Sequence, residues 1–309
     1  MLRALGKGAA LALLGRLPGG ARAYRELTRV HLGTQASHVD KLRRVLPGYV
    51  AAWRELGGLE LEGRRLWIHE PGWTPFWALA CYLLTGRGGA LTNVEARLLD
   101  RYLARAVNGV LALPLGSPVR RRRVEALRWC HDCRAAIRAL SAELHEACDP
   151  VALPLPRASV DLVHSGGALE HYAPEQLRAF LAECRRVVRP GGLVSHVLDH
   201  RDHLYHVDHA FPFLAHLALP APLYGALLGG ALTYHNRLAP AQVAALFEEA
   251  GFRRIAVRRL VLPSQTYVSD EALESARPGL PRALLARERR ALSEADRRTA
   301  AAHYLYRRS

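Results

Sequence analysis

The chain of 309 residues is half hydrophobic, which is enough to bury one large core. Its formal net charge is +15, yet the basic residues are scattered except for the run at 120–123. Because no aromatic residues alternate with basic ones, we expect no nucleic-acid partner. Five Cys in this length argue against a disulfide framework and fit reduced thiols.

Residues 1–60 are predicted to form an N-terminal helical cap. Hydrophobic residues recur at helical spacing over residues 24–56. Arg3 and Lys7 precede an apolar run at 9–14, which leaves a signal peptide as an alternative. Because that run is short and glycines follow it, we favour a cap on a cytoplasmic protein.

Residues 61–309 are predicted to form one α/β domain. Short apolar runs predict strands at 65–69, 90–94, 143–148, 160–165, 193–198, 252–262 and 303–307. Helical patterns lie between them at 75–84, 98–113, 129–140, 174–188 and 240–250. Residues 116–123 are interpreted as an exposed basic loop and residues 190–192 as a sharp turn. This alternation requires crossovers and a mainly parallel sheet with helices on both faces.

Two further segments have competing interpretations. Cys130 and Cys133 form a CxxC that is either a redox or metal pair or, as we favour, one turn of the helix at 129–140. The apolar stretch 211–232 is broken by prolines and falls short of the ~18 apolar residues of a membrane span. We interpret it as an apolar cap, within an insertion at 199–238, that contacts a membrane or a greasy substrate.

Carboxylates gather where the predicted strands end. The loops after the first five strands begin at Glu70, Glu95, Asp149, Ser165 and Asp199. Four of these five residues are acidic. Since parallel α/β sheets bind ligands at the carboxyl ends of their strands, these loops predict the site.

Five segments form a recognisable combination: 149–155, the strand at 159–163, Ser-Gly-Gly-Ala-Leu-Glu-His at 165–171, residues 181–186 and Arg-Pro-Gly-Gly-Leu at 189–193. Together they resemble a class I S-adenosylmethionine (SAM) methyltransferase of type 11, over about residues 60–260. The resemblance implies a Rossmann-like fold with a mainly parallel seven-stranded sheet, and SAM as cofactor.

The first cofactor loop is similar to the family pattern but degraded. Where the family has an acid, any residue, Gly, any residue and Gly, this chain has Ile68, His69, Glu70, Pro71 and Gly72, followed by Trp-Thr-Pro at 73–75. Glycine lets the backbone approach the ligand closely. Two interpretations stay open: the Glu70 carboxylate replaces the acid lost at position 68, or cofactor affinity is lost.

The resemblance implies a set of cofactor-binding residues. Glu95 is expected to take the ribose hydroxyls, because one carboxylate accepts two hydrogen bonds. Asp149 resembles the family's adenine-side acid, although a turn aspartate before proline is nearly as good an interpretation. With these residues we assign the cofactor site to Glu70, Gly72, Trp73, Glu95, Asp149, Ser165 and Gly166.

A His-rich segment follows the strand at 193–198. Three interpretations compete: a metal site, a general base for catalysis, or a polar loop without chemistry. We expect no metal, because the spacings of these residues match no standard metal-binding motif. Asp199, Arg201, Asp202, His203 and His206 resemble a pattern in a methyltransferase subfamily, as does Asn-Arg-Leu at 236–238. We predict His203 as base, Asp202 or Asp199 as its orienting group, and Arg201 or Arg237 as anchor for an anionic acceptor.

Two functions follow from these features. The first is SAM-dependent methyl transfer, to oxygen rather than nitrogen, on a small anionic or glycosidic molecule such as a sugar or natural-product scaffold. The second is a methyltransferase-like protein that has lost methyl transfer and serves as a binding partner or a repurposed enzyme. Residues 68 and 70 favour the second function, while Glu95, Asp149 and the His-rich segment favour the first.

Overall fold

The computed structural model describes residues 2–20, 22–24, 35–69, 72–93, 98–206, 209, 212–228, 234–261, 267–268 and 281–309. The strands within these residues are β1 (Leu66–His69), β2 (Ala90–Asn93), β3 (Glu143–Glu146), β4 (Val160–Gly166), β5 (Val188–Asp199), β6 (Phe252–Val261), β7 (Tyr267–Val268) and β8 (Thr299–Arg308). They form one sheet in the order β3-β2-β1-β4-β5-β8-β6-β7.

The sheet is mixed in direction. Strands β3, β2, β1, β4 and β5 pair in parallel. Strand β8 is antiparallel to both β5 and β6, so β6 runs with the parallel set, and the two-residue β7 adds an antiparallel edge. The predicted Rossmann-like, mainly parallel sheet is therefore confirmed, with one short edge strand beyond the seven expected.

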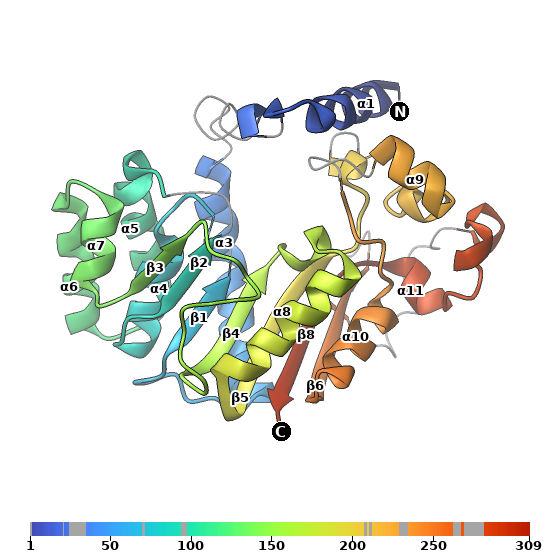
Figure 1. The fold of residues 1–309 in the computed structure, drawn as a ribbon. Helices are drawn as coiled ribbons and strands as arrows, with labels where there is room; N and C mark the ends of the chain where they lie inside the picture. Colours follow the sequence, from blue (N-terminus) through green and yellow to red (C-terminus); the bar gives the residue numbers. More distant parts are fainter. Residues whose placement is uncertain are drawn as a thin grey trace.

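Helices cover both faces of the sheet (Figure 1). On one face lie α3 (Gln35–Ala51), the π-helical turn η1 (Ala52–Leu56), α4 (Phe76–Thr85), α5 (Leu103–Leu111), α6 (Pro118–Ala126) and α7 (Cys133–Ala139). On the other face lie α8 (Pro174–Val187) and α10 (Pro240–Glu249). The remaining helices are α1 (Leu2–Arg16), α9 (Ala221–Leu228) and α11 (Glu294–Arg298), with short 3₁₀ turns η2 (Asp100–Tyr102), η3 (Leu127–Trp129), η4 (Leu169–His171), η5 (His203–His206), η6 (Ala215–Leu217), η8 (Arg282–Leu284) and η9 (Arg287–Arg289).

A buried polar group joins the predicted cap to the sheet. The Trp53 indole nitrogen donates to Ser195 Oγ at 2.8 Å, across the interface between η1 and β5. The same hydroxyl lies 2.8 Å from His303 Nε2, and the ring of His164 donates to the Ser195 carbonyl at 2.8 Å. Residues 35–56 thus share the core of the sheet. The domain division at residue 60 stays a prediction.

Three local predictions are wrong. Residues 118–126 form α6 rather than a loop, because Ser117 caps the helix by accepting from Arg120 N and Pro118 occupies its first turn. The CxxC is not one helical turn, since Cys130 is extended and α7 begins at Cys133 after the cap of Asp132.

The third correction concerns the Pro-Gly-Gly segment. Residues 190–192 lie inside β5 at a shift of its register against β4, rather than in a turn before the strand. Gly191 has φ +75°, which an L-residue adopts only with strain. The irregularity therefore forms within the strand, and β5 begins at the end of α8.

Candidate cofactor and acceptor site

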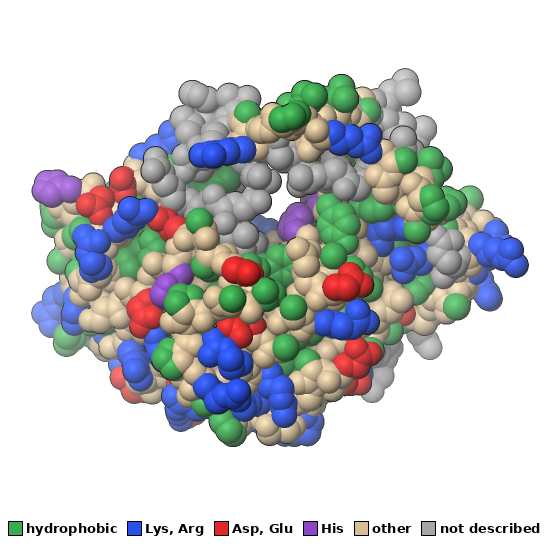
Figure 2. Space-filling view, in the orientation of Figure 1, with side chains coloured by type: hydrophobic (Ala, Val, Ile, Leu, Met, Phe, Trp, Pro, Cys, Tyr) green, Lys and Arg blue, Asp and Glu red, His purple; other side chains and the backbone are tan. Residues whose placement is uncertain are grey.

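The parallel strands end at one edge of the sheet, beneath α1 (Figure 1). The last residues there are His69 of β1, Asn93 of β2, Gly166 of β4 and Asp199 of β5. Seen with all atoms, the molecule is hollowed beneath α1, with a histidine side chain at the edge of the hollow (Figure 2). This edge is where the sequence predicted the site.

The first loop keeps the geometry of its second glycine. Gly72 has φ +77°, and its carbonyl accepts from Asn93 Nδ2 at 3.1 Å. The next residue, Trp73, accepts from Leu99 N at 2.8 Å through its carbonyl. Strand β2 and the segment after it therefore hold this loop in place. Glu70, Pro71 and Glu95 lie outside the described residues.

Thr74 is a site candidate that the sequence did not reveal. Its hydroxyl oxygen is fully buried and has no hydrogen-bond partner among the described residues. A buried hydroxyl without a partner is costly, so such a group in a ligand loop indicates a partner supplied by the ligand. In the sequence, Thr74 is marked only by its position two residues after Gly72, the second glycine of the loop pattern.

His69 occupies the loop's second position and is also fully buried. Its Nδ1 lies 2.9 Å from Thr92 Oγ1 and its Nε2 lies 2.6 Å from the Tyr172 hydroxyl. Burial lowers the pKa of His69 to about 3, so the ring is neutral at physiological pH. The ring links β1 to β2 and to the segment before α8, which fixes the base of the loop.

Ile68, at the position of the family's first acid, faces the core with 1% exposure. It packs with α4 residues rather than reaching the loop. Position 68 therefore supplies no acid to the loop, while Glu70 lies outside the described residues.

Three more of the predicted cofactor-binding residues, Asp149, Ser165 and Gly166, lie near the carboxyl ends of the parallel strands, and each makes different contacts. The exposed Asp149 accepts from Val151 N at 3.0 Å, which is the turn geometry that the sequence offered as an alternative. The Ser165 hydroxyl is buried and lies 2.7 Å from His196 Nδ1. At Gly166, an added Cβ would meet only His164 Nε2, at 3.9 Å, so its backbone is open to close approach.

Asp199 organises the acceptor side of the edge. Its carboxylate accepts hydrogen bonds from two nitrogens of Arg201, from Nε at 2.7 Å and from Nη2 at 2.6 Å. His206 Nε2 donates to the same carboxylate at 3.1 Å. Burial acts to raise the pKa of Asp199, but the hydrogen bonds from His206 and Arg201 outweigh it and hold the pKa well below its usual range. Asp199 is thus a permanent anion that fixes His206 with Nδ1 directed away from it.

Neither predicted aspartate orients His203. Asp202 is buried, accepts from Leu204 N at 2.8 Å and lies 3.8 Å from His216 Nδ1. The His203 ring instead lies between two imidazoles, with centroids 5.0 Å from His171 and 5.4 Å from His235. Burial lowers the pKa of His203 to about 3, which makes it a weak base.

Arg237 is buried and serves the loop rather than the open edge. Its Nε donates to the His216 carbonyl at 3.0 Å, and a terminal nitrogen donates to the Leu219 carbonyl. The guanidinium lies 4.7 Å from the centre of the Tyr224 ring. The residue has φ +57°, an uncommon backbone conformation outside glycine. It therefore anchors residues 216–219 over the sheet, a role that side-chain chemistry alone did not indicate.

Helix α1 contacts the His-rich segment directly. At Gly8, an added Cβ would lie 2.6 Å from a Leu204 methyl carbon, so α1 packs closely on η5 at this point. Arg16 donates to the Ala226 carbonyl at the other end of the helix. The helix thus bridges η5 and α9 above the edge.

Among the described residues, no three His, Cys, Asp or Glu side chains converge as metal ligands would. No helix among those residues has the length and apolar character that crossing a membrane requires.

Residues 121–195 match the model of a family described as a methyltransferase domain. No curated protein matches the chain. Similar solved structures include an S-adenosylmethionine-dependent methyltransferase from Mesorhizobium loti, at 16% identity and TM-score 0.43, covering 84% of this chain and 98% of that one. A geranyl diphosphate C-methyltransferase from Streptomyces coelicolor A3(2) is 12% identical with TM-score 0.46, covering 90% and 85%. A phosphoethanolamine N-methyltransferase of Haemonchus contortus is 13% identical with TM-score 0.45, covering 85% of this chain and 52% of that one.

The strand order, the antiparallel β8 and the family match are those of class I SAM-dependent methyltransferases. The match to the methyltransferase-domain family extends over residues 121–195 of the chain.

The described residues fit the cofactor of this class at the first loop. Gly72 has the positive φ that brings its backbone close to a ligand, and the orphaned Thr74 hydroxyl offers a hydrogen bond. Gly72, Trp73 and Thr74 are the residues of this loop that would hold SAM.

Proposed function

We propose that the protein transfers a methyl group from SAM to a hydroxyl of a small anionic or glycosidic molecule. The observation that carries this proposal is the Asp199–His206 pair at the carboxyl end of β5, on the sheet edge that bears the Gly72–Thr74 loop. When bound, SAM supplies a methyl group on a positively charged sulfur. The protein must then align the acceptor and remove its proton.

We assign the proton transfer to His206 rather than His203. His206 is 43% exposed at its side chain and donates Nε2–H to Asp199, so its Nδ1 lone pair is available to an acceptor hydroxyl. The fixed negative charge of Asp199 stabilises the imidazolium that forms when the proton arrives. Arg201, held on the same carboxylate, is the cation nearest this pair in sequence and remains our anchor for an anionic acceptor.

The remaining residues predicted from the sequence are proposed to bind the cofactor or to shape the acceptor site. Glu70, Glu95, Asp149, Ser165 and Gly166 stay proposed contacts for the cofactor, with Ser165 acting through its backbone because its hydroxyl is used by His196. His203 and Asp202 are proposed to shape the acceptor site without carrying the proton. We also propose a cytoplasmic setting, consistent with five free cysteines, and contact of residues 211–232 with a membrane or greasy substrate.

Titration of the purified chain with SAM in a calorimeter tests the cofactor assignment. We expect a Kd in the micromolar range, about −8 kcal/mol. Gly72→Val should weaken binding at least tenfold, because a branched residue at φ +77° strains the loop and fills the space of the ligand. Gly63→Val is the matched control, since Gly63 has φ +68° with open space around it at the other end of β1. Equal losses in both variants would contradict the assignment.

One observation favours the second function, a methyltransferase-like binding protein. The acid of the first loop is replaced by the core residue Ile68. If the wild-type chain binds neither SAM nor its demethylated product at millimolar concentration, this second function replaces the first.

A further inference from the structure

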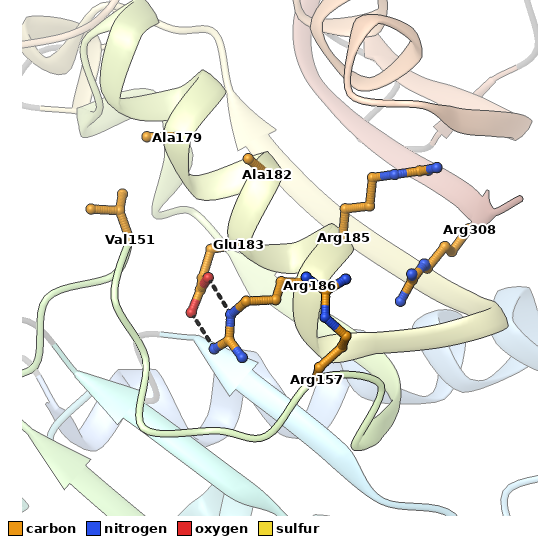
Figure 3. A pocket seen from close by; sticks show the side chains of 8 residues that line it. All are labelled: Val151, Arg157, Ala179, Ala182, Glu183, Arg185, Arg186 and Arg308. Atoms are coloured by element: carbon orange, nitrogen blue, oxygen red, sulfur yellow. Dashed lines mark hydrogen bonds and ion pairs between the residues drawn. The ribbon is translucent and has the colours of Figure 1, made fainter.

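A second cavity lies on the far side of the molecule from the methyltransferase edge. It has a volume of about 500 Å³ and is lined by arginines from three separate elements. Arg185 and Arg186 come from the end of α8, Arg157 from the loop before β4 and Arg308 from the end of β8. In Figure 3, Arg157 and Arg308 extend toward one another, the Arg186 guanidinium is turned to Glu183, and Arg185 points away from that pair.

The cavity carries an excess of positive charge. Its one acidic lining residue, Glu183, is occupied: it accepts from Arg186 at 2.6 and 2.7 Å and from Leu153 N at 2.8 Å. Arg185 donates to the Gly251 carbonyl at 2.5 Å, and Arg308 donates to the Val188 carbonyl. Among the described residues, no carboxylate pairs with Arg157, Arg185 or Arg308.

Arg308 has an unused donor inside this cavity. Its Nε is buried and has no hydrogen-bond partner among the described residues. Burial, followed by the nearby charges of Arg185 and Arg157, lowers the pKa of Arg308 from its ordinary value. Like charges held together at a concave surface attract an anion that satisfies several guanidinium groups at once.

Around this cavity, basic side chains gather along the lower part of the face in Figure 2, over the amino end of the parallel strands. The positive charge of this surface therefore attracts an anion from a distance to the same cavity in which the arginines would bind it. The cavity is open to solvent on one side, and its volume of about 500 Å³ is in the range that holds a small molecule.

We propose that this arginine cavity binds a compound bearing a diphosphate or two neighbouring phosphates, at a site separate from methyl transfer. Guanidinium groups donate paired hydrogen bonds that match phosphate oxygens, and three arginines without a carboxylate partner match the charge of a diphosphate. Such a ligand is either a soluble diphosphate compound or the phosphate of a lipid headgroup, and both present the same chemistry to the cavity.

Calorimetric titration of the full chain with inorganic pyrophosphate tests the proposal, at ionic strength held constant with sodium chloride. We expect saturable binding that weakens at least tenfold in Arg157→Gln and in Arg308→Gln. Arg157 is exposed on a loop, so its variant should fold even if the change at Arg308 disturbs β8. Arg122→Gln, an exposed arginine on α6, is the matched control and should bind as the wild type does.

Vesicles distinguish the two sources of phosphate. Binding of pyrophosphate without binding to phosphatidic-acid vesicles indicates a soluble ligand, and binding to those vesicles but not to neutral ones indicates a lipid headgroup. Absence of both, or equal weakening in Arg122→Gln, would overturn the proposal. SAM affinity, measured in the same variants, should not change, which separates this site from the proposed function.

Discussion

His206→Gln is expected to lower kcat of methyl transfer by 10²- to 10⁴-fold, the usual contribution of a positioned general base. Glutamine still donates to Asp199 but cannot take a proton from the acceptor. The affinity for SAM should stay within about twofold, because His206 belongs to the acceptor side of the edge. The measurement is transfer of labelled methyl from SAM to the best acceptor in a panel of sugars and phenols, beside a SAM titration.

Two further variants sharpen this test. Asp199→Asn should reduce kcat to a similar extent, since it removes the charge that stabilises the His206 imidazolium and that orients Arg201. His209→Gln, an exposed histidine three residues further on, should leave kcat unchanged. If His203→Gln abolishes transfer while His206→Gln retains it, then the sequence-based choice of His203 is right and our assignment is wrong.

The protein is expected to lose its stability steeply as the pH falls from 6.5 toward 5. Burial lowers the pKa of six histidines to about 3 or 4: His69, His164, His200, His203, His235 and His303. In the unfolded chain each titrates near pH 6.5. Above that pH both states are neutral, and below it the unfolded state binds more protons, so acid favours unfolding.

The loss of stability caused by these histidines in acid is large compared with the total free energy of folding. At pH 5, each such histidine destabilises the fold by about 2 kcal/mol, because 1.36 kcal/mol corresponds to one pH unit of proton binding. Domains are stable by only about 5–15 kcal/mol. The raised pKa of the buried Asp202 acts in the opposite sense, but it is a single group.

Urea unfolding followed by tryptophan fluorescence, from pH 7.5 to pH 5, measures this dependence. Between pH 6 and 5 we expect the free energy of unfolding to fall by at least about 5 kcal/mol, the uptake of four protons. His303→Gln should reduce the uptake by about one proton, and the exposed His209→Gln should leave it unchanged. A fall of less than about 1.4 kcal/mol over that range would contradict burial of these histidines as neutral rings.

The strands were predictable because a strand that is buried on both faces is a continuous run of apolar residues in the sequence. Strand β4 is buried from Val160 to Ser165, and β1 is buried throughout, so both appear as short continuous apolar runs. The segment at 190–192 was predicted wrongly because Pro-Gly-Gly usually marks a turn. Strand β5 pairs with β4 on both sides of this segment, at Val188 and again from Leu193, and this tertiary pairing continues the strand through it.

The site was predictable only in its location. The rule that parallel sheets bind ligands at their carboxyl ends brought Gly72, Ser165 and Asp199 to one edge. Residue type and spacing then suggested His203 as base, because a histidine beside an aspartate in sequence is an ordinary dyad. In the structure the 3₁₀ turn of residues 203–206 turns His206, not His203, onto Asp199.

By itself, the sequence determined the fold class, the order of elements and the edge that carries the site, because these depend on hydrophobic periodicity and on chirality rules shared by all such sheets. Only the tertiary structure decided which side chains meet there. It buried Arg237 under the loop, left the Thr74 hydroxyl without a partner among the described residues, and placed Arg157, Arg185 and Arg308 around one cavity from distant parts of the chain. Contacts between residues far apart in sequence depend on how whole elements pack, and no local pattern records that packing.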